Sequence, residues 1–275
     1  MEVRPDDVWL VTYPRSGTTM TCEILWLMMN NLDYEKAAKT HMFHRRHFLE
    51  FFTFLHEQTQ DLNTYPSLHD FPIGYRLAAS APSPRLVVTH LPLSLLPPKV
   101  VDVARVVFVA RDPRDVAVSW YHLLKMYRCF DFVGDFKEFW KLFMEDSILF
   151  TPFFPRLKET WVLRNHPKML FLFYEDMIKD KPSTLNKISS FCGKQYSQEL
   201  LLTLADHLSI DMFRQNQSVQ SVLETIPGMN NEGGEGFIRK GKSGGWRDYF
   251  DEEMRLQAET WIQRNLAGTD ITFVF

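Results

Sequence analysis

Cysteine is scarce in this chain, which has only three in 275 residues. An odd and widely spaced set, Cys22, Cys129 and Cys192, argues against a disulfide framework and predicts a reducing compartment. No Cys-x-x-Cys pair occurs, so the cysteines give no indication of a zinc site. We expect a cytoplasmic protein that carries no metal.

Long hydrophobic runs and an excess of positive charge are absent as well. No apolar stretch approaches the roughly 18 residues of a membrane-spanning helix, and residues 1–7 lack the apolar core of a signal peptide. The 31 Lys and Arg residues are outnumbered by 34 Asp and Glu, for a net charge of −3. Neither a membrane nor a nucleic acid is therefore an expected partner, although a local basic pocket is compatible with this balance.

Phenylalanine, in contrast, is abundant, with 23 residues in a chain whose hydrophobic fraction is 45%. This composition suits one large soluble domain over residues 1–275 with a sizeable core. The phenylalanines fit two interpretations, which are an aromatic core and an aromatic pocket for an apolar ligand.

Four short apolar runs predict buried strands at residues 8–12, 86–89, 105–110 and 169–173. They do not alternate with polar residues, as is typical of a parallel sheet covered on both faces. Helical patterns are expected at residues 18–31, 112–127, 136–146, 155–165, 183–192, 197–207 and 252–265. This alternation predicts an α/β fold of three layers with a doubly wound, mostly parallel sheet, in which ligands bind beyond the carboxyl ends of the strands.

The segment Tyr13-Pro14-Arg15-Ser16-Gly17-Thr18-Thr19 links the first predicted strand to the first predicted helix. Backbone N–H groups converge on an anion at such a strand–loop–helix junction, and the helix dipole assists. Three hydroxyl groups and the forked cation of Arg15 add further donors. We interpret the segment as a phosphate-binding loop like that of P-loop proteins, rather than as a simply capped turn.

Two long segments, residues 56–84 and 224–245, are predicted as lid or pocket loops. The second contains Gly236-Phe237-Ile238-Arg239-Lys240-Gly241-Lys242-Ser243, which matches the phosphate loop of ATP- and GTP-binding proteins. Its context differs from that loop, because no apolar strand precedes it and no apolar helix follows it. We interpret it as a basic, anion-binding lid and keep a P-loop kinase as the weaker alternative.

Polar side chains also follow the other predicted strands. His90 comes after the second strand, and histidine titrates near working pH. Arg111 follows the third strand, and Ser119 lies two helical turns further on, so that the two side chains suit a second anion. Tyr174 follows the fourth strand. Two anion sites beside one histidine suggest a nucleotide with two phosphate groups and a general base.

The order of these motifs resembles that of the cytosolic sulfotransferases, over residues 8 to 250. The family's 5′-phosphosulfate loop resembles residues 13–19, and its catalytic-histidine motif resembles Thr89-His90-Leu91-Pro92. Its 3′-phosphate site is similar to residues 109–115 with Ser119, and a further signature is similar to Phe173-Tyr174-Glu175-Asp176. Its C-terminal nucleotide lid resembles Arg239-Lys240-Gly241 with Gly244-Gly245-Trp246.

The resemblance implies transfer of a sulfo group from 3′-phosphoadenylyl sulfate (PAPS) to a hydroxyl or amine, with 3′,5′-ADP (PAP) as the other product. It implies that His90 is the general base and that Arg15 stabilises the departing phosphate. The cofactor-binding residues it implies are Arg15, Ser16, Gly17, Thr18, Thr19, Met20, Arg111, Ser119, Tyr174, Ser209, Phe237, Ile238, Arg239, Lys240 and Gly241. No metal is required.

Four positions depart from the family pattern. Arg15 and Val88 stand where lysines are usual, Met20 stands where tryptophan is usual, and Ile210 near Ser209 replaces an aromatic residue. Arginine is the poorer proton donor to a leaving group. The departures at Arg15, Val88 and Met20 motivate an alternative hypothesis, a cofactor-binding protein with weak or lost turnover.

The acceptor implied by the resemblance is a small apolar molecule such as a phenol, a steroid-like compound or another alcohol. The aromatic side chains we expect around it are Phe43, Phe48, Phe51, Phe52, Phe54, Phe130, Phe132, Phe150 and Phe153. Some relatives dehydrate an allylic alcohol through a transient sulfate ester, which is a further alternative.

Two other features concern the ends of the chain. In many family members an N-terminal segment before the first strand closes the acceptor pocket; we expect this chain to lack it, with residues 56–84 as a candidate substitute. The family's usual dimer motif is not preserved at residues 247–256, so we expect a monomer or a different dimer.

Overall fold

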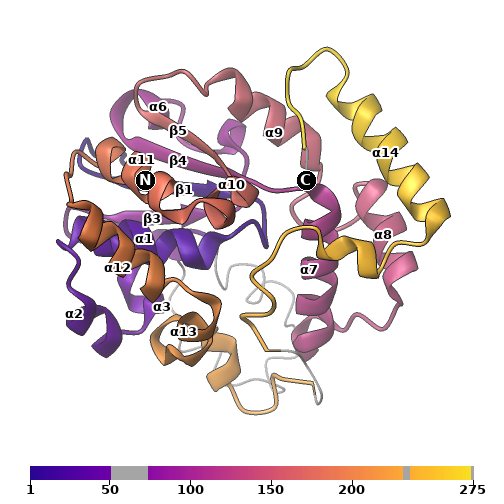
Figure 1. Ribbon diagram of the computed structural model, residues 1–275, viewed down its shortest axis with the longest axis horizontal. Coiled ribbons are helices and arrows are strands. Elements are labelled where there is room, and N and C mark those ends of the chain that lie inside the picture. The colour runs from indigo at the N-terminus through magenta and orange to yellow at the C-terminus, as the bar shows by residue number, and fades with distance from the viewer. Residues whose placement is uncertain (51–73, 232–235, 274–275) are drawn as a thin grey trace.

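The computed structural model describes residues 1–50, 74–231 and 236–273. Its centre is a parallel sheet in the order β2-β3-β1-β4-β5, with helices on both faces (Figure 1). The strands are β1 (Val8–Thr12), β2 (His47–Phe48), β3 (Leu86–Thr89), β4 (Arg105–Ala110) and β5 (Met169–Phe173). The predicted α/β fold with a parallel sheet is confirmed, and all four predicted strands have the expected bounds. The edge strand β2 was missed because two residues are too few to form a pattern.

The two faces of the sheet carry separate hydrophobic cores, since neighbouring residues of a strand point to opposite sides. On one face Trp9, Val11 and Phe108 pack with side chains of the helices on the right of Figure 1. On the other face Leu10, Val88 and Val107 pack with helices at residues 18–29, 181–191 and 198–207. This double cover explains why the strands read as unbroken apolar runs.

The seven predicted helices are all present, with ends that differ by up to three residues. They are α1 (Thr18–Met29), α7 (Pro113–Met126), α8 (Phe136–Met144), α9 (Phe153–Val162), α11 (Lys181–Phe191), α12 (Gln198–His207) and α14 (Glu252–Leu266). Caps set several of these ends. Asp112 accepts a hydrogen bond from the backbone N–H of Arg114 ahead of α7, and Asp135 and Glu138 form a capping box at α8.

Within the described residues, six short α-helices were not predicted: α2 (Tyr34–Lys39), α3 (Met42–Arg45), α5 (Gly74–Ser80), α6 (Val100–Val103), α10 (Tyr174–Lys179) and α13 (Ile210–Gln215). Helix α5 corrects the loop expected over residues 56–84, of which residues 56–73 lie outside the described part. Helices of one or two turns carry too little periodicity to be recognised in a sequence.

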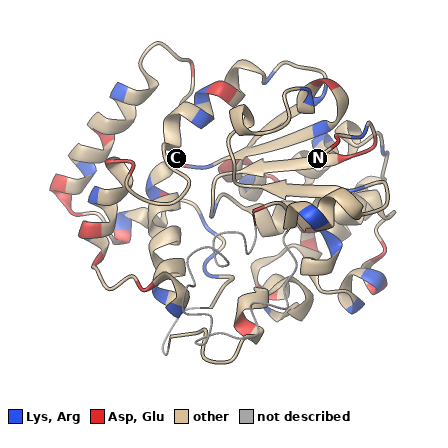
Figure 2. Cartoon of the chain, turned by 180° about the vertical axis from the view of Figure 1, so that it is seen from behind, with Lys and Arg blue, Asp and Glu red and all other residues tan. Residues whose placement is uncertain are grey.

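Charge and hydrophobicity are spread along the chain as the composition indicated. Lys and Arg alternate with Asp and Glu on the side seen in Figure 2. Among the helices that the structure describes, none has the length and apolar character needed to cross a bilayer.

Candidate functional site

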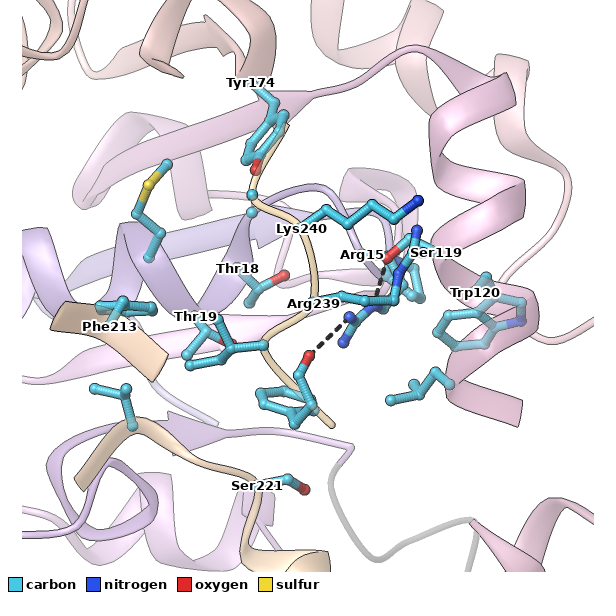
Figure 3. Close-up of a pocket in the computed structure, with 18 of the residues that line it drawn as sticks. Arg15, Thr18, Thr19, Ser119, Trp120, Tyr174, Phe213, Ser221, Arg239 and Lys240 are labelled. Carbon is cyan, nitrogen blue, oxygen red and sulfur yellow. Dashed lines mark hydrogen bonds between the residues drawn. The ribbon is translucent and has the colours of Figure 1, made fainter. Parts of the chain in front are cut away.

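A cavity of about 910 Å³ lies at the carboxyl ends of the strands. It is lined by the segments that follow β1, β3, β4 and β5, together with residues 237–245 (Figure 3). The structure brings to its wall every residue expected to bind the cofactor or catalyse, with two exceptions. Ser16 is fully buried behind the loop, and Ser209 precedes α13 outside the lining.

The loop after β1 has an unusual backbone that fits an anion site. Arg15 and Gly17 have positive φ angles of 67° and 89°, and no side chain caps the N-terminus of α1. The first-turn N–H groups of α1 at Thr18 and Thr19 therefore lack a capping partner from a side chain. A Cβ atom at Gly17 would lie 2.6 Å from Cδ2 of Tyr174, so this close approach requires glycine.

Arg15 is held at one side of the cavity by two hydrogen bonds. Its Nε donates to Oγ of Ser119 (2.9 Å), and its Nη2 donates to the carbonyl oxygen of Phe237 (3.0 Å), as Figure 3 shows. Burial, and next the neighbouring Arg111, lower the pKa of Arg15 to about 10. The side chain remains a cation at neutral pH in a crowded positive environment. The phosphate loop, the Ser119 region and the lid are thus joined through one guanidinium.

Arg111 is a second cation that lines the cavity beside Arg15. Its Nη1 donates to the carbonyl oxygen of Arg15 (2.7 Å), and its Cζ lies 4.4 Å from the centroid of the Tyr174 ring. Its Nη2 donates to the carbonyl oxygen of Lys242 (3.2 Å) in the lid. The lid lacks regular secondary structure at residues 236–244, as the sequence context indicated. Within it, Gly241 has a φ of +60° and packs closely on Ile210.

His90 occupies the middle of the cavity wall. Its Nδ1 lies 3.0 Å from the carbonyl oxygen of Thr12, which can only accept, so Nδ1 carries the proton and Nε2 is free to accept one. Burial lowers the pKa of His90 to about 3, which keeps the ring neutral at physiological pH. Thr12 Oγ1 in turn lies 2.8 Å from Thr18 Oγ1, so a short polar chain links His90 to the anion-binding loop.

Two buried charged side chains hold the backbone of His90, and the sequence did not reveal either. Glu50 accepts a hydrogen bond from the His90 backbone N–H and another from Thr89 Oγ1 (2.9 Å). Arg156 donates to the His90 carbonyl oxygen. Burial raises the pKa of Glu50 to about 7. No local motif marks these residues, because they reach His90 from positions 40 and 66 residues away.

Aromatic side chains make up the rest of the wall. Phe43, Phe48, Phe130 and Phe150 line the cavity, and the rings of Phe48 and Phe150 have centroids 4.8 and 5.3 Å from that of His90. Phe153 is buried in the core and Phe132 packs against the core, and neither lines the cavity, which corrects two of the expected pocket residues. The expected residues Phe51, Phe52 and Phe54 lie outside the described part of the chain.

The cavity is also lined by apolar residues that the sequence did not indicate, which are Phe213, Leu208 and Ile178, together with the expected Met20. In Figure 3, Phe213 lies on the side of Thr19, away from Arg15 and Ser119. Apolar side chains of this kind suit a nucleotide base. Within the described residues, no three His, Cys, Asp or Glu side chains are grouped to hold a metal ion.

Comparison with known proteins decides the family. The profile of the sulfotransferase domain matches residues 5–270. The chain belongs to the sulfotransferase family. It is 32% identical to sulfotransferase 1A1 of Bos taurus over 274 residues, which are 99% of this chain and 87% of the relative. It is 33% identical to sulfotransferase 1 family member D1 of Mus musculus over 250 residues, which cover 90% and 79% of the two chains. The expected enzyme class is confirmed, and the family's sulfo donor is PAPS.

Solved structures extend this finding. Retinol dehydratase in complex with androsterone and the inactive cofactor PAP is 41% identical, with a TM-score of 0.91 over 99% of this chain and 84% of that chain. The same enzyme with retinol and PAP has a TM-score of 0.92 at 40% identity, over 100% and 85% of the two chains. Mouse sulfotransferase SULT7A1 with PAP, at 20% identity and a TM-score of 0.73 over 98% and 87% of the chains, supports the fold.

Proposed function

We propose that this sulfotransferase moves the sulfo group of PAPS to the hydroxyl group of a small, largely apolar acceptor. The observation that carries the proposal is one cavity with two unlike halves. A nucleotide side is built from Arg15, Thr18 and Arg111, and an acceptor side from Phe48 and Phe150. The ring of His90 contacts the nucleotide side through Thr12 and the acceptor side through both phenylalanines.

The nucleotide side fits PAPS in charge and shape. The uncapped N-terminus of α1 and the hydroxyl groups of Thr18 and Thr19 suit the 5′-phosphosulfate. Ser119 and Arg111 suit the 3′-phosphate together with Arg239 and Lys240 of the lid. The remaining residues that we assign to the nucleotide are Gly17, Met20, Tyr174, Phe237, Ile238 and Gly241. When bound, PAPS supplies the sulfo group and a phosphate leaving group.

His90 is the residue that we assign as general base. Because Nδ1 donates to the Thr12 carbonyl, the free electron pair of Nε2 is available to take the proton of the acceptor hydroxyl. In the complete step the acceptor oxygen bonds to sulfur, the sulfur–oxygen bond to the 5′-phosphate breaks, and the proton moves to Nε2. Glu50 and Arg156 hold the His90 backbone and so keep the ring in place.

Arg15 and the α1 N-terminus are placed to stabilise the charge that develops on the departing phosphate. Arginine does this electrostatically, because its pKa of about 10 makes it a poor proton donor near neutral pH.

Transfer assays with ³⁵S-labelled PAPS and paired acceptors test the proposal. Apolar alcohols and phenols should become labelled, and a carbohydrate of similar size should not. Calorimetric titration should show tighter binding of PAP than of ATP, because only PAP carries a 3′-phosphate. Tighter binding of ATP would instead support the kinase alternative, and PAP binding without transfer to any acceptor would support a protein that has lost turnover.

Dehydration of an allylic alcohol is the second candidate function. The observation that favours it is the higher identity to retinol dehydratase, 41% against 32% for sulfotransferase 1A1. The same chemistry serves both outcomes, because a sulfate ester formed at an allylic position can lose sulfate and a proton to give an alkene.

Product analysis separates the two functions. With retinol and PAPS, a dehydratase yields an anhydro product and free sulfate, whereas a simple sulfotransferase yields the stable ester. Mass spectrometry of the organic product decides between them, and a saturated alcohol serves as the matched acceptor that can be sulfated but cannot form a conjugated alkene.

A further inference from the structure

We infer that Arg46 is a second catalytic cation, which lines the cavity beside Phe48 and binds the oxygens of the sulfo group. The inference rests on the proposed function. Arg46 precedes β2, lines the cavity and has no counterpart among the motifs that the sequence revealed.

Contacts fix the position of the Arg46 guanidinium from two directions. Its Nη1 lies 3.6 Å from Sγ of Cys22, one helical turn beyond Thr18 and Thr19 on α1. Its Cζ lies 5.0 Å from the centroid of the Phe48 ring, which is itself in edge contact with His90. The guanidinium therefore lies close to both the anion-binding turn and the general base.

The influence of Arg46 on the pKa of His90 agrees with a position close to the histidine ring. The cations that lower the pKa of His90, after burial, are Arg156, Arg46 and Arg15 in that order. Arg156 is buried and bonded to the carbonyl oxygens of His90 and Phe150. The two remaining cations, Arg46 and Arg15, both line the cavity together with His90.

Arg46 has no carboxylate partner among the residues that the structure describes. Its Nε is buried without a hydrogen-bond acceptor, and a sulfur atom is a weak acceptor for Nη1. The adjacent Arg45 shows the contrast, because it is paired with Glu23 at 2.6 Å and also donates to Ser218. A half-buried cation without a counterion is costly in the free protein, and an anionic ligand at this place would offset that cost.

Arg15 alone is poorly placed for the sulfo group. Its Nε and Nη2 are engaged by Ser119 and Phe237, on the side of the 3′-phosphate and the lid. Strand β3 provides no cation either, since Val88 is fully buried in the core below the cavity. Arg46 comes from the segment that leads into the neighbouring strand, two residues before Phe48, which pairs with Val88, and its side chain lines the cavity.

During transfer the three sulfo oxygens keep negative charge while sulfur passes from the phosphate oxygen to the acceptor oxygen. Arg46 donates N–H groups to these oxygens throughout and takes part in no proton transfer, because arginine stays protonated. His90 receives the acceptor proton, and the electron pair of the broken bond remains on the 5′-phosphate of PAP.

The variant Arg46→Met tests the inference, because methionine keeps much of the side-chain length without the charge. We expect kcat to fall about 100-fold, in the range for loss of one charge-stabilising donor. PAP lacks the sulfo group, so its affinity should stay within twofold of the wild-type value. The ratio of PAPS affinity to PAP affinity, measured by titration without acceptor, should fall about tenfold. Arg46→Lys should recover part of kcat. The matched control is Arg76→Met, an exposed arginine on α5 outside the cavity.

Three results would overturn the inference: an unchanged kcat with an unchanged PAPS preference, a parallel loss of PAP and PAPS affinity, or an effect confined to the KM of acceptors that carry a carboxylate. The last result would make Arg46 an acceptor-binding residue. Failure of the proposed function looks different, since the wild type would then bind both nucleotides and label no acceptor. The PAPS preference of Arg46→Met would still decide the role of Arg46 in that case.

Discussion

The nucleotide side and the acceptor side of the cavity are built in different ways. On the nucleotide side, polar groups are tied to one another by short hydrogen bonds, such as those from Arg15 to Ser119 and from Arg111 to Arg15. On the acceptor side, rings such as Phe43, Phe130 and Phe150 line the cavity with apolar surface and contact other aromatic rings. A fixed, charged ligand needs fixed donors, whereas an apolar ligand needs only a cavity of suitable shape.

This difference explains why the sequence motifs indicated the residues of the nucleotide side more completely than those of the acceptor side. Donors that hold phosphate must keep their residue types and spacing, whereas apolar side chains can exchange as long as the volume is kept. The difference also makes the two sides separable by substitution, and it can be tested with variants of His90 and of residues on each side.

The largest loss of kcat is expected for a substitution of His90, which contacts both the nucleotide side and the acceptor side. Substitution His90→Asn keeps an N–H group near the Thr12 carbonyl but removes Nε2, so kcat should fall about 10²- to 10⁴-fold, the usual contribution of a general base. PAP affinity should be unchanged in calorimetric titration. A kcat within a few-fold of wild type, in steady-state assays at saturating PAPS, would show that another group takes the acceptor proton.

A substitution on the nucleotide side should weaken PAP binding without changing the acceptor KM. In Gly17→Ala the new Cβ would collide with Tyr174, which also supports Arg111. We expect the Kd of PAP to rise roughly 10- to 100-fold, which corresponds to about 1.4–3 kcal/mol.

The matched control for Gly17→Ala is Gly228→Ala. Gly228 has a similar φ of +74° but no heavy atom within 4 Å of the added Cβ, so it isolates backbone strain from the collision. Equal losses of PAP affinity in the two variants would show that the contact with Tyr174 is unimportant.

On the acceptor side, the neighbouring residues Phe150 and Phe153 should behave differently. Phe150 lines the cavity beside His90, so Phe150→Ala should raise the acceptor KM about tenfold and leave PAP affinity unchanged. Phe153 is buried in the core, so Phe153→Ala should instead lower the free energy of unfolding by about 3–5 kcal/mol. Denaturant titration and steady-state kinetics on both variants check this pair, and identical behaviour would refute the division.

The sequence best predicted the strands and the polar residues that follow directly after them. The strand runs predicted four strands with their bounds, and the motifs after them placed Arg15, His90, Arg111 and Tyr174 around one cavity. In a parallel sheet the carboxyl ends of the strands meet at one edge, so residues that follow strands are brought together by the topology alone.

Contacts between distant segments were not predictable in the same way. Glu50 and Arg156 reach the backbone of His90 through tertiary packing, and Arg46 reaches α1 from the residue before a two-residue strand. The division of phenylalanines between core and cavity also depends on packing, since Phe132 and Phe150 have the same chemistry in the sequence. Ser16 is fully buried and does not line the cavity, and its backbone N–H donates to the carbonyl oxygen of Tyr13, a local contact that no sequence motif indicated.

The hydrogen bond from Arg15 to Phe237 joins residues 222 positions apart. During synthesis all five strands of the sheet are available once Phe173 has left the ribosome, yet the cavity still lacks the lid around residues 237–243. The core on one face of the sheet is completed equally late, because Trp246, Phe250 and Trp261 pack there from beyond the lid. The residues after Phe173 thus complete both the core and the proposed nucleotide site, and a chain that ended before the lid would lack part of each.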